Sequence, residues 1–277
     1  MIVSENGVIR KDGIRLENPF ESGYTTGYGI FETVCVNKGE PLFLQEHYNR
    51  MKISLPKLKL PDLPEYTTVR EWCSEYFKEL SIESGIKSFS GKLRINWVKR
   101  GSLSADMHIY GDIFSYPREW YENGICSCFS KDIYFTGSKL DSTKTLSYAE
   151  NIVEKSNAME NGYQEVLRLN QDGVVCEGTM SNVFWIKENI LYTPALETGA
   201  LPGIIRQWVI EKAQEEGIEI IEKICGKASL DEVDAIFFTN SLLGIMPVSL
   251  FENRRVETLE DETYMLFKDK YRKLLEK

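Results

Sequence analysis

The sequence contains few of the residues that build metal centres or disulfide frameworks. Its 277 residues include two histidines, His47 and His108, and six cysteines that are scattered without a C-x-x-C pair. A structural zinc site needs clustered cysteine or histidine ligands at close spacing, so this pattern argues against a metal centre. We expect the cysteines to be reduced and mostly buried thiols.

The chain also lacks an excess of positive charge and long apolar segments. It carries 33 Lys and Arg against 42 Asp and Glu, a net charge of -9, so we expect no nucleic-acid or anionic-membrane partner. No apolar run approaches the roughly 20 residues that span a bilayer. Met1 leads directly into the strand-like IVSENGVIR rather than into a signal peptide. These features favour a cytoplasmic enzyme that acts on small metabolites.

Two kinds of hydrophobic pattern alternate along the chain. Short alternating runs around Asn6-Gly7 and Asp172-Gly173 are typical of β-hairpins. Apolar residues at helical spacing predict helices near residues 69–85 and 259–277. The combination predicts a mixed α/β (α+β) fold.

One stretch, Pro117 to Asn123, interrupts the strand pattern with polar and aromatic residues. We interpret residues 117–123 as an interdomain linker. The chain would then form a smaller N-terminal α/β domain over residues 1–116 and a larger C-terminal domain over residues 124–277.

A lysine and a glutamate between Lys144 and Phe184 suit the two ends of a pyridoxal ring. The Lys144 amine can form a Schiff base with an aldehyde and later carry a proton, because its long stem lets the nitrogen swing. Such a cofactor also needs an acid at its ring nitrogen, since the protonated ring withdraws electrons from the substrate. Glu177 falls near the end of a predicted strand, where alternation can point it into a site.

Six short blocks of the sequence extend this interpretation beyond the lysine and the glutamate. They are G-Y-G-I-F-E-T (27–33), H-Y-N-R-M (47–51), K-T-L-S-Y (144–148), C-E-G-T-M-S-N-V-F (176–184), A-L-P-G-I-I-R-Q (200–207) and T-N-S-L-L-G-I-M-P-V (239–248). In this order they resemble the class IV aminotransferases, the fold type IV pyridoxal 5'-phosphate enzymes. Aminodeoxychorismate lyases and the branched-chain and D-amino acid aminotransferases belong to this family. The resemblance implies a two-domain, D-amino acid aminotransferase-like fold, a C-terminal cofactor-binding domain and a homodimer.

The resemblance also implies a site for the cofactor phosphate. Arg50 of the H-x-x-R pattern would grip phosphate oxygens with its planar guanidinium. The backbone amides of Ile204 and Ile205, which follow Pro202-Gly203 at a predicted helix start, would cradle the phosphate. A second cradle is expected at Ser241 and Leu242, directly after an apolar strand.

Three further residues are candidates for contact with the substrate. Arg94 and Arg100 lie on predicted strands where arginines of several family members hold a substrate carboxylate, and Phe31 lies in the G-Y-G-I-F-E-T block. Either arginine is as well explained as an ordinary charge on a strand surface. The substrate is therefore expected to be a small amino compound.

Two reactions stay open within the family. An aminotransferase would convert the amino substrate into a keto acid, whereas a lyase would eliminate pyruvate from aminodeoxychorismate to give 4-aminobenzoate. The block T-N-S-L-L-G-I-M-P-V looks closer to the lyases. Cys35, Tyr28 and the loop SLSADMHIY depart from patterns common in the family. The sequence therefore separates the two reactions only in part.

Two other classes of function compete with these reactions. A non-catalytic pyridoxal-phosphate-binding paralogue or carrier would need no electron-withdrawing ring, so the presence of both Lys144 and Glu177 argues against it. A hydrolase with a nucleophilic Cys176 is the second alternative, although neither histidine can be tied to that cysteine from the sequence.

Overall fold

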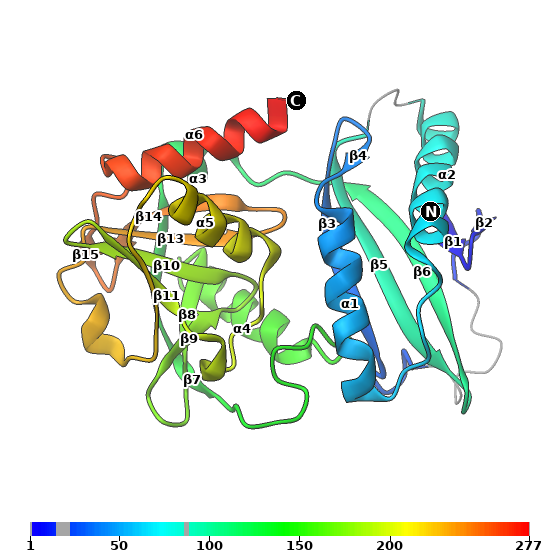
Figure 1. Cartoon of the computed structure of the whole chain (residues 1–277), viewed down its shortest axis with the longest axis horizontal. Coiled ribbons are helices and arrows are strands. Elements are labelled where there is room, and N and C mark those ends of the chain that lie inside the picture. Colours follow the sequence, from blue (N-terminus) through cyan, green and yellow to red (C-terminus); the bar gives the residue numbers. More distant parts are fainter. Residues whose placement is uncertain (1, 15–22, 86–88, 277) are drawn as a thin grey trace. The chain divides into compact units, whose positions relative to one another are not determined.

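The computed structural model describes residues 2–14, 23–85 and 89–276, which form two compact units (Figure 1). The first unit comprises Met1–Ser115 and Thr143–Tyr148, and the second comprises Tyr116–Ser142 and Ala149–Lys277. The expected linker over residues 117–123 carries helix α3 (Arg118–Asn123), and these residues group with the second unit. The assignment of residues 124–277 as the cofactor-binding domain stays a prediction.

Both units combine a sheet with helices, as the hydrophobic patterns predicted. The elements of the first unit are β1 (Val3–Glu5), β2 (Val8–Arg10), β3 (Gly29–Asn37), β4 (Glu40–Pro41), α1 (Leu44–Leu58), α2 (Tyr66–Ser84), β5 (Gly91–Arg100) and β6 (Ser104–Ile113). After α3, the elements of the second unit are β7 (Ile125–Tyr134), α4 (Ala149–Glu160), β8 (Glu165–Asn170), β9 (Val175–Gly178), β10 (Asn182–Lys187), β11 (Ile190–Pro194), η2 (Leu196–Thr198), α5 (Ile204–Glu215), β12 (Ile220–Lys223), η3 (Lys227–Leu230), β13 (Ala235–Asn240), β14 (Gly244–Phe251), β15 (Arg254–Arg255) and α6 (Glu262–Glu276).

The first unit is an antiparallel sheet with the strand order β2-β1-β6-β5-β3-β4. The predicted Asn-Gly hairpin is confirmed, because Asn6 and Gly7 adopt φ values of 49° and 83° between β1 and β2. Helix α1 packs on β3, and helix α2 packs on β1 and β6 (Figure 1). Apolar side chains such as Met51, Val69 and Leu93 fill the space between the helices and the sheet.

The second unit contains a larger mixed sheet with the strand order β12-β11-β10-β13-β14-β7-β8-β9, and β15 pairs with β14. Strands β7 and β8 run parallel, as do β14 and β7, while β8 and β9 form the predicted Asp-Gly hairpin. Strand β9 also contacts β10 and β11, so the sheet curls back on itself. A short turn of three residues, Thr179 to Ser181, joins the end of β9 to the start of β10.

Helices cover the second sheet from several directions (Figure 1). Helix α4 packs on β8, α5 packs on β12 and β13, and α3 and α6 pack on β14. The predicted apolar stripe of the last helix is confirmed, since Tyr264, Phe267 and Tyr271 are buried. Within the part of the chain that the structure describes, no helix combines the length and the apolar composition needed to cross a membrane.

The six cysteines are all unpaired thiols. Cys73 and Cys176 are buried, whereas Cys35, Cys126, Cys128 and Cys225 are only half-buried. The expectation that most of them are buried is therefore wrong for four of the six: Cys35, Cys126 and Cys128 lie within strands β3 and β7 at partly exposed positions, and Cys225 follows β12.

Candidate active site

The segment that carries Lys144 is tied to strand β3 of the first unit. The Phe31 amide donates a hydrogen bond to the Lys144 carbonyl at 2.9 Å, and the Leu146 amide donates to the Gly29 carbonyl at 3.0 Å. Gly27 allows this close approach, because it has a φ of 67° and a Cβ there would lie 2.3 Å from the Ser147 hydroxyl oxygen. The backbone position of Lys144 is thus set by β3.

Aromatic rings surround the Lys144 amine. Its Nζ atom lies 4.4 Å from the centre of the Phe31 ring and 5.0 Å from the centre of the Tyr148 ring. These two rings meet edge to face with centres 5.1 Å apart. Because ring faces attract cations and exclude water, they form a defined cradle for an ammonium group.

The Arg94 guanidinium lies on the same buried Phe31 ring, 3.3 Å from its centre. Arg94 Nε donates to the Asn96 side-chain oxygen at 3.1 Å, and Nη1 lies 3.5 Å from the Thr33 hydroxyl oxygen. The structure therefore brings Phe31, Arg94 and Lys144 together. The Phe31 ring contacts two cationic groups, the Arg94 guanidinium and the Lys144 amine.

Arg100, the other arginine predicted to contact the substrate, has different surroundings. It is the last residue of β5, its side chain is 56% exposed, and its Nε lies 3.4 Å from Asp106. The structure favours the surface-charge interpretation for Arg100 and leaves Arg94 as the candidate ligand for a carboxylate.

Arg50 belongs to a buried charge cluster with Glu32 and His47. Arg50 Nε donates to Glu32 Oε1 at 2.8 Å, Nη2 donates to Oε2 at 2.5 Å, and His47 Nδ1 lies 2.7 Å from Oε2. Burial alone would raise the pKa of Glu32, but the charges of Arg50 and His47 outweigh it and hold this pKa at about 2. Glu32 therefore accepts hydrogen bonds from the Nε and Nη2 donors of the Arg50 guanidinium.

Glu177 is a buried carboxylate in the second unit whose two oxygens accept hydrogen bonds from three directions. Arg168 Nη2 donates to Oε1 at 3.2 Å, while Asn182 Nδ2 and the Leu201 amide donate to Oε2 at 3.2 and 2.8 Å. The donors come from β8, β10 and the segment before α5. Glu177 is thus a buried, hydrogen-bonded carboxylate and not an exposed charge on a strand.

Arg168 and Asn182 were not identified from the sequence. The β8–β9 register pairs Leu167 with Gly178 and Leu169 with Val175, so Arg168 lies opposite the strand segment that contains Glu177. The sequence does contain a signal that could have identified Arg168. It is a charged residue inside the mostly apolar strand E-V-L-R-L-N, and the opposite strand of the predicted hairpin carries Glu177. Arg168 is 1% exposed, and its guanidinium carbon lies 3.9 Å from the centre of the Tyr134 ring.

The start of helix α5 offers free-standing backbone donors of the kind that bind anions. Ile204 and Ile205 are its first residues, and first-turn amides have no acceptor within their own helix. Gly203 is the N-cap residue of α5 and lies against the Asn182 side chain. A Cβ at Gly203 would lie 1.9 Å from the Asn182 side-chain oxygen. Asn182 therefore donates a hydrogen bond to Glu177 and also packs against Gly203 at the start of α5.

The turn after β13 contains the second predicted phosphate cradle. The Asn240 side-chain oxygen accepts hydrogen bonds from the Leu242 and Leu243 amides at 2.8 and 2.7 Å, so the Leu242 amide is already engaged. The hydroxyl of Thr239 is buried without a hydrogen-bond partner among the described residues. Ser241 and this orphaned hydroxyl are better candidates for a phosphate oxygen than the Leu242 amide.

These observations test whether pyridoxal phosphate fits the residues present. The cofactor needs a reactive lysine, an ionised acid for its ring nitrogen and several donors for its phosphate. Lys144 in its aromatic cradle, the triply bonded Glu177, and the α5 amides with the unpartnered Thr239 hydroxyl supply these three features. The donor set therefore fits this cofactor.

Cys176 does not have the surroundings of a nucleophile. Its side chain is 0% exposed, and its thiol donates to the Thr198 carbonyl at 2.9 Å. Burial raises the pKa of Cys176 to about 11, so the reactive thiolate is scarce at neutral pH. The geometry therefore argues against a cysteine hydrolase.

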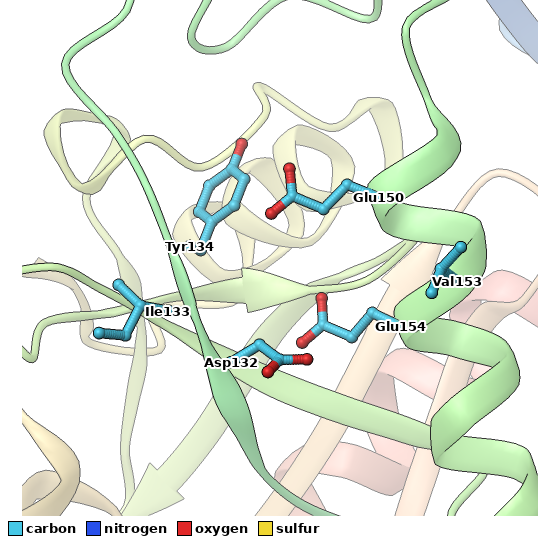
Figure 2. Close-up of a pocket in the computed structure, with 6 residues that line it drawn as sticks. All are labelled: Asp132, Ile133, Tyr134, Glu150, Val153 and Glu154. Atoms are coloured by element: carbon cyan, nitrogen blue, oxygen red, sulfur yellow. The ribbon is translucent and has the colours of Figure 1, made fainter.

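A pocket of about 140 Å³ in the second unit is lined by residues of β7 and α4. Figure 2 shows the carboxylates of Asp132, Glu150 and Glu154 and the Tyr134 ring around this space. Burial is the main cause that raises the pKa of Glu154, and the charge of Asp132 adds to it. None of the predicted site residues lines this pocket.

Comparisons with known proteins give one consistent family. The sequence profile described as "Amino-transferase class IV" matches residues 29–251. The chain is 29% identical over 264 residues to "Aminodeoxychorismate lyase" of Bacillus subtilis (strain 168), with 89% of this chain and 85% of that protein covered. It is 26% identical over 255 residues to "D-alanine aminotransferase" of Bacillus licheniformis, with 85% and 83% covered.

A solved structure shares the fold. It is described as "Putative 4-amino-4-deoxychorismate lyase" from Legionella pneumophila subsp. pneumophila str. Philadelphia 1, and it superposes with a TM-score of 0.82 at 24% identity. The match covers 94% of this chain and 97% of that chain.

Proposed function

Because the chain belongs to the class IV aminotransferase family, we propose that it is a pyridoxal-phosphate-dependent transferase or lyase acting on an amino acid or a similar amino compound. The fold type IV, D-amino acid aminotransferase-like fold expected from the sequence is confirmed by the structural likeness. The proposal rests above all on Glu177, because a buried carboxylate with three donors is a costly arrangement that an ordinary strand position does not need.

Each side chain of the proposed site has a chemical task. Pyridoxal phosphate, when bound, supplies an aldehyde that condenses with amines and a ring that withdraws electrons. Lys144 would hold the cofactor through its amine and would move the proton at the substrate α-carbon. Glu177 would hold a proton at the ring nitrogen. Phe31 and Tyr148 orient the Lys144 amine and keep water from it.

The remaining residues bind the charged ends of cofactor and substrate. We assign the phosphate to Arg50, the amides of Ile204 and Ile205, and Ser241. Arg94 is the proposed ligand for a substrate carboxylate, because its guanidinium is held over the Phe31 ring by contacts with Asn96 and Thr33. A preoriented arginine loses less conformational freedom when a carboxylate binds.

Elimination of pyruvate from aminodeoxychorismate is the first candidate reaction, supported by the name of the Bacillus subtilis relative. Transamination is the second candidate, supported by the name of the Bacillus licheniformis relative. A non-catalytic carrier is not favoured, because both the lysine and the buried acid are present.

The test is a product assay with purified protein and added pyridoxal phosphate. Aminodeoxychorismate is offered first, then D- and L-amino acids with a keto-acid acceptor, and Lys144→Ala is the control. Formation of 4-aminobenzoate supports the lyase, and formation of a keto acid from an amino acid supports the aminotransferase. No turnover of any of these substrates by cofactor-loaded protein would contradict the proposed function.

We further propose a cytoplasmic homodimer, which the family resemblance suggests. Light scattering coupled to size exclusion would give twice the 31.9 kDa chain mass for a dimer. A mass of one chain over the working concentration range would contradict it.

A further inference from the structure

Arg168 lies between two buried carboxylates of the second unit. Its Nη2 atom is 3.2 Å from Glu177 Oε1, and its Nη1 atom is 4.0 Å from Glu154 Oε2. Glu177 comes from β9, Glu154 from α4 and Arg168 from β8. One positive charge thus faces two negative charges, and all three groups are at least about nine-tenths buried.

Both carboxylates are held by donors other than Arg168. The Ser130 hydroxyl donates to Glu154, while Asn182 and the Leu201 amide hold Glu177. The Tyr134 ring covers the guanidinium at 3.9 Å. Burial raises the pKa of Tyr134 to about 12, so this ring is neutral at ordinary pH and adds no charge.

When both carboxylates are ionised, the single positive charge of Arg168 is divided between Glu154 and Glu177. A protonated ring nitrogen next to Glu177 would add a second positive charge beside that carboxylate. An opposite charge within about 4–6 Å typically lowers the pKa of a carboxyl group by about 1–3 units. The share of the Arg168 charge that reaches Glu177 therefore decides how strongly Glu177 attracts that proton.

Resting on the proposed function, we propose that Arg168 is a positioning residue that weakens the hold of Glu177 on the proton of the cofactor ring nitrogen. Glu154 opposes this effect by drawing part of the Arg168 charge toward the pocket of Figure 2. The pair tunes the electron-withdrawing power of the ring without touching the substrate.

Several other titratable groups surround Glu154. Asp132 and Tyr134 face it from β7, Arg168 and Glu165 from β8, and Glu150 lies one turn earlier on its own helix. Glu165 is itself bonded by Thr179 and Ser181 and lies 3.4 Å from Lys155 Nζ. Glu150 is exposed at the pocket mouth and gives a matched control for a lost carboxylate.

The test follows the ¹⁵N chemical shift of the ring nitrogen of ¹⁵N-labelled pyridoxal phosphate bound to the whole protein, as a function of pH. Arg168→Met should raise the apparent pKa of this nitrogen by about one unit or more, because Glu177 loses its cation. Glu154→Gln should lower the same pKa, because the Arg168 charge is no longer shared. Arg168→Lys should restore most of the wild-type value, and Glu150→Gln should leave it unchanged.

The nitrogen pKa should rise in Arg168→Met and fall in Glu154→Gln. A merely structural role of Arg168 and Glu154 would not produce changes of opposite sign. If Arg168→Met does not fold, Glu154→Gln and Arg168→Lys still decide the matter. An unchanged nitrogen pKa in Glu154→Gln, or an equal change in Glu150→Gln, would overturn the inference while leaving the proposed function intact. Wild-type protein that does not bind the cofactor would overturn both.

Discussion

Phe31 and Lys144 are joined twice, once through the backbone and once through the side chains. The Phe31 amide donates to the Lys144 carbonyl at 2.9 Å, and the Lys144 Nζ atom lies 4.4 Å from the centre of the Phe31 ring. The backbone bond sets where the lysine leaves the chain, and the ring sets where its amine comes to rest. The proposed catalytic group is therefore positioned by a strand of the first unit.

Replacing Phe31 with leucine should impair this positioning. Phe31→Leu removes ring contacts to Lys144 and Arg94 that contribute about 0.5–2 kcal/mol each, so turnover should fall by about tenfold. Phe77→Leu makes the same change in the α2 core and controls for lost packing. Steady-state kinetics of both variants, with the substrate that the product assay identifies, check this prediction. Equal losses of turnover in the two variants would contradict the role of the Phe31 ring.

Gly203 should tolerate no side chain. A Cβ at this position would lie 1.9 Å from the Asn182 side-chain oxygen, and Asn182 holds Glu177. Gly203→Ala should cost about 1–3 kcal/mol of unfolding free energy through overpacking and should weaken cofactor binding. At Gly226 the nearest atom to an added Cβ is 3.5 Å away, so Gly226→Ala is the control. Urea unfolding and a cofactor titration measure the two effects.

The buried cluster around Glu32 should make the protein sensitive to acid. The charges of Arg50 and His47 overcome burial and hold the folded pKa of Glu32 at about 2, below its ordinary value of 4.5. The unfolded chain therefore takes up a proton before the folded chain does. The stability contributed by this group is complete above about pH 4.5 and is lost as the pH falls toward 2.

His47 adds to this acid sensitivity. Burial lowers its folded pKa below 6.5, so the unfolded state binds more protons as the pH falls below that value. Glu32→Gln should cost about 3–5 kcal/mol at pH 7 and flatten the acid side of the stability profile. Urea unfolding between pH 3 and pH 7 checks this. An unchanged slope in the variant would show that the acid sensitivity arises elsewhere.

Cys176 should resist alkylation in the folded protein. Its thiol is fully buried, donates to the Thr198 carbonyl and has a pKa raised to about 11 by burial. Treatment with iodoacetamide followed by peptide mass analysis should find Cys176 unlabelled, whereas the urea-unfolded chain should be labelled at all six cysteines. Rapid native labelling of Cys176 with loss of activity would instead favour a cysteine nucleophile.

Local sequence patterns predicted several elements but not the short helix α3. The hairpins at Asn6-Gly7 and Asp172-Gly173 and the apolar stripe of α6 could be predicted because their signals lie within a short stretch of sequence. Helix α3 is six residues long, which is too short for a helical period to emerge, so its residues looked like a linker.

The partners of the site residues depended on contacts between distant parts of the chain. Arg94 and Arg100 are six residues apart on β5 and point to the same face. Only their neighbours distinguish the two arginines: Arg94 lies over the Phe31 ring, and Arg100 lies beside the Asp106 carboxylate. The donors around Glu177 likewise depend on the β8–β9 register, which places Arg168, and on the approach of Leu201 from a distant part of the chain.

We propose above all that Lys144 carries the cofactor. The protein is loaded with pyridoxal phosphate, its visible spectrum is recorded, and borohydride reduction is followed by peptide mass analysis, with Lys144→Ala and Lys139→Ala as parallel samples. We expect a visible band that is present in wild type and Lys139→Ala and lost in Lys144→Ala, with the reduced pyridoxyl group on Lys144. A pyridoxyl group on another lysine, or a band that survives in Lys144→Ala, would contradict it.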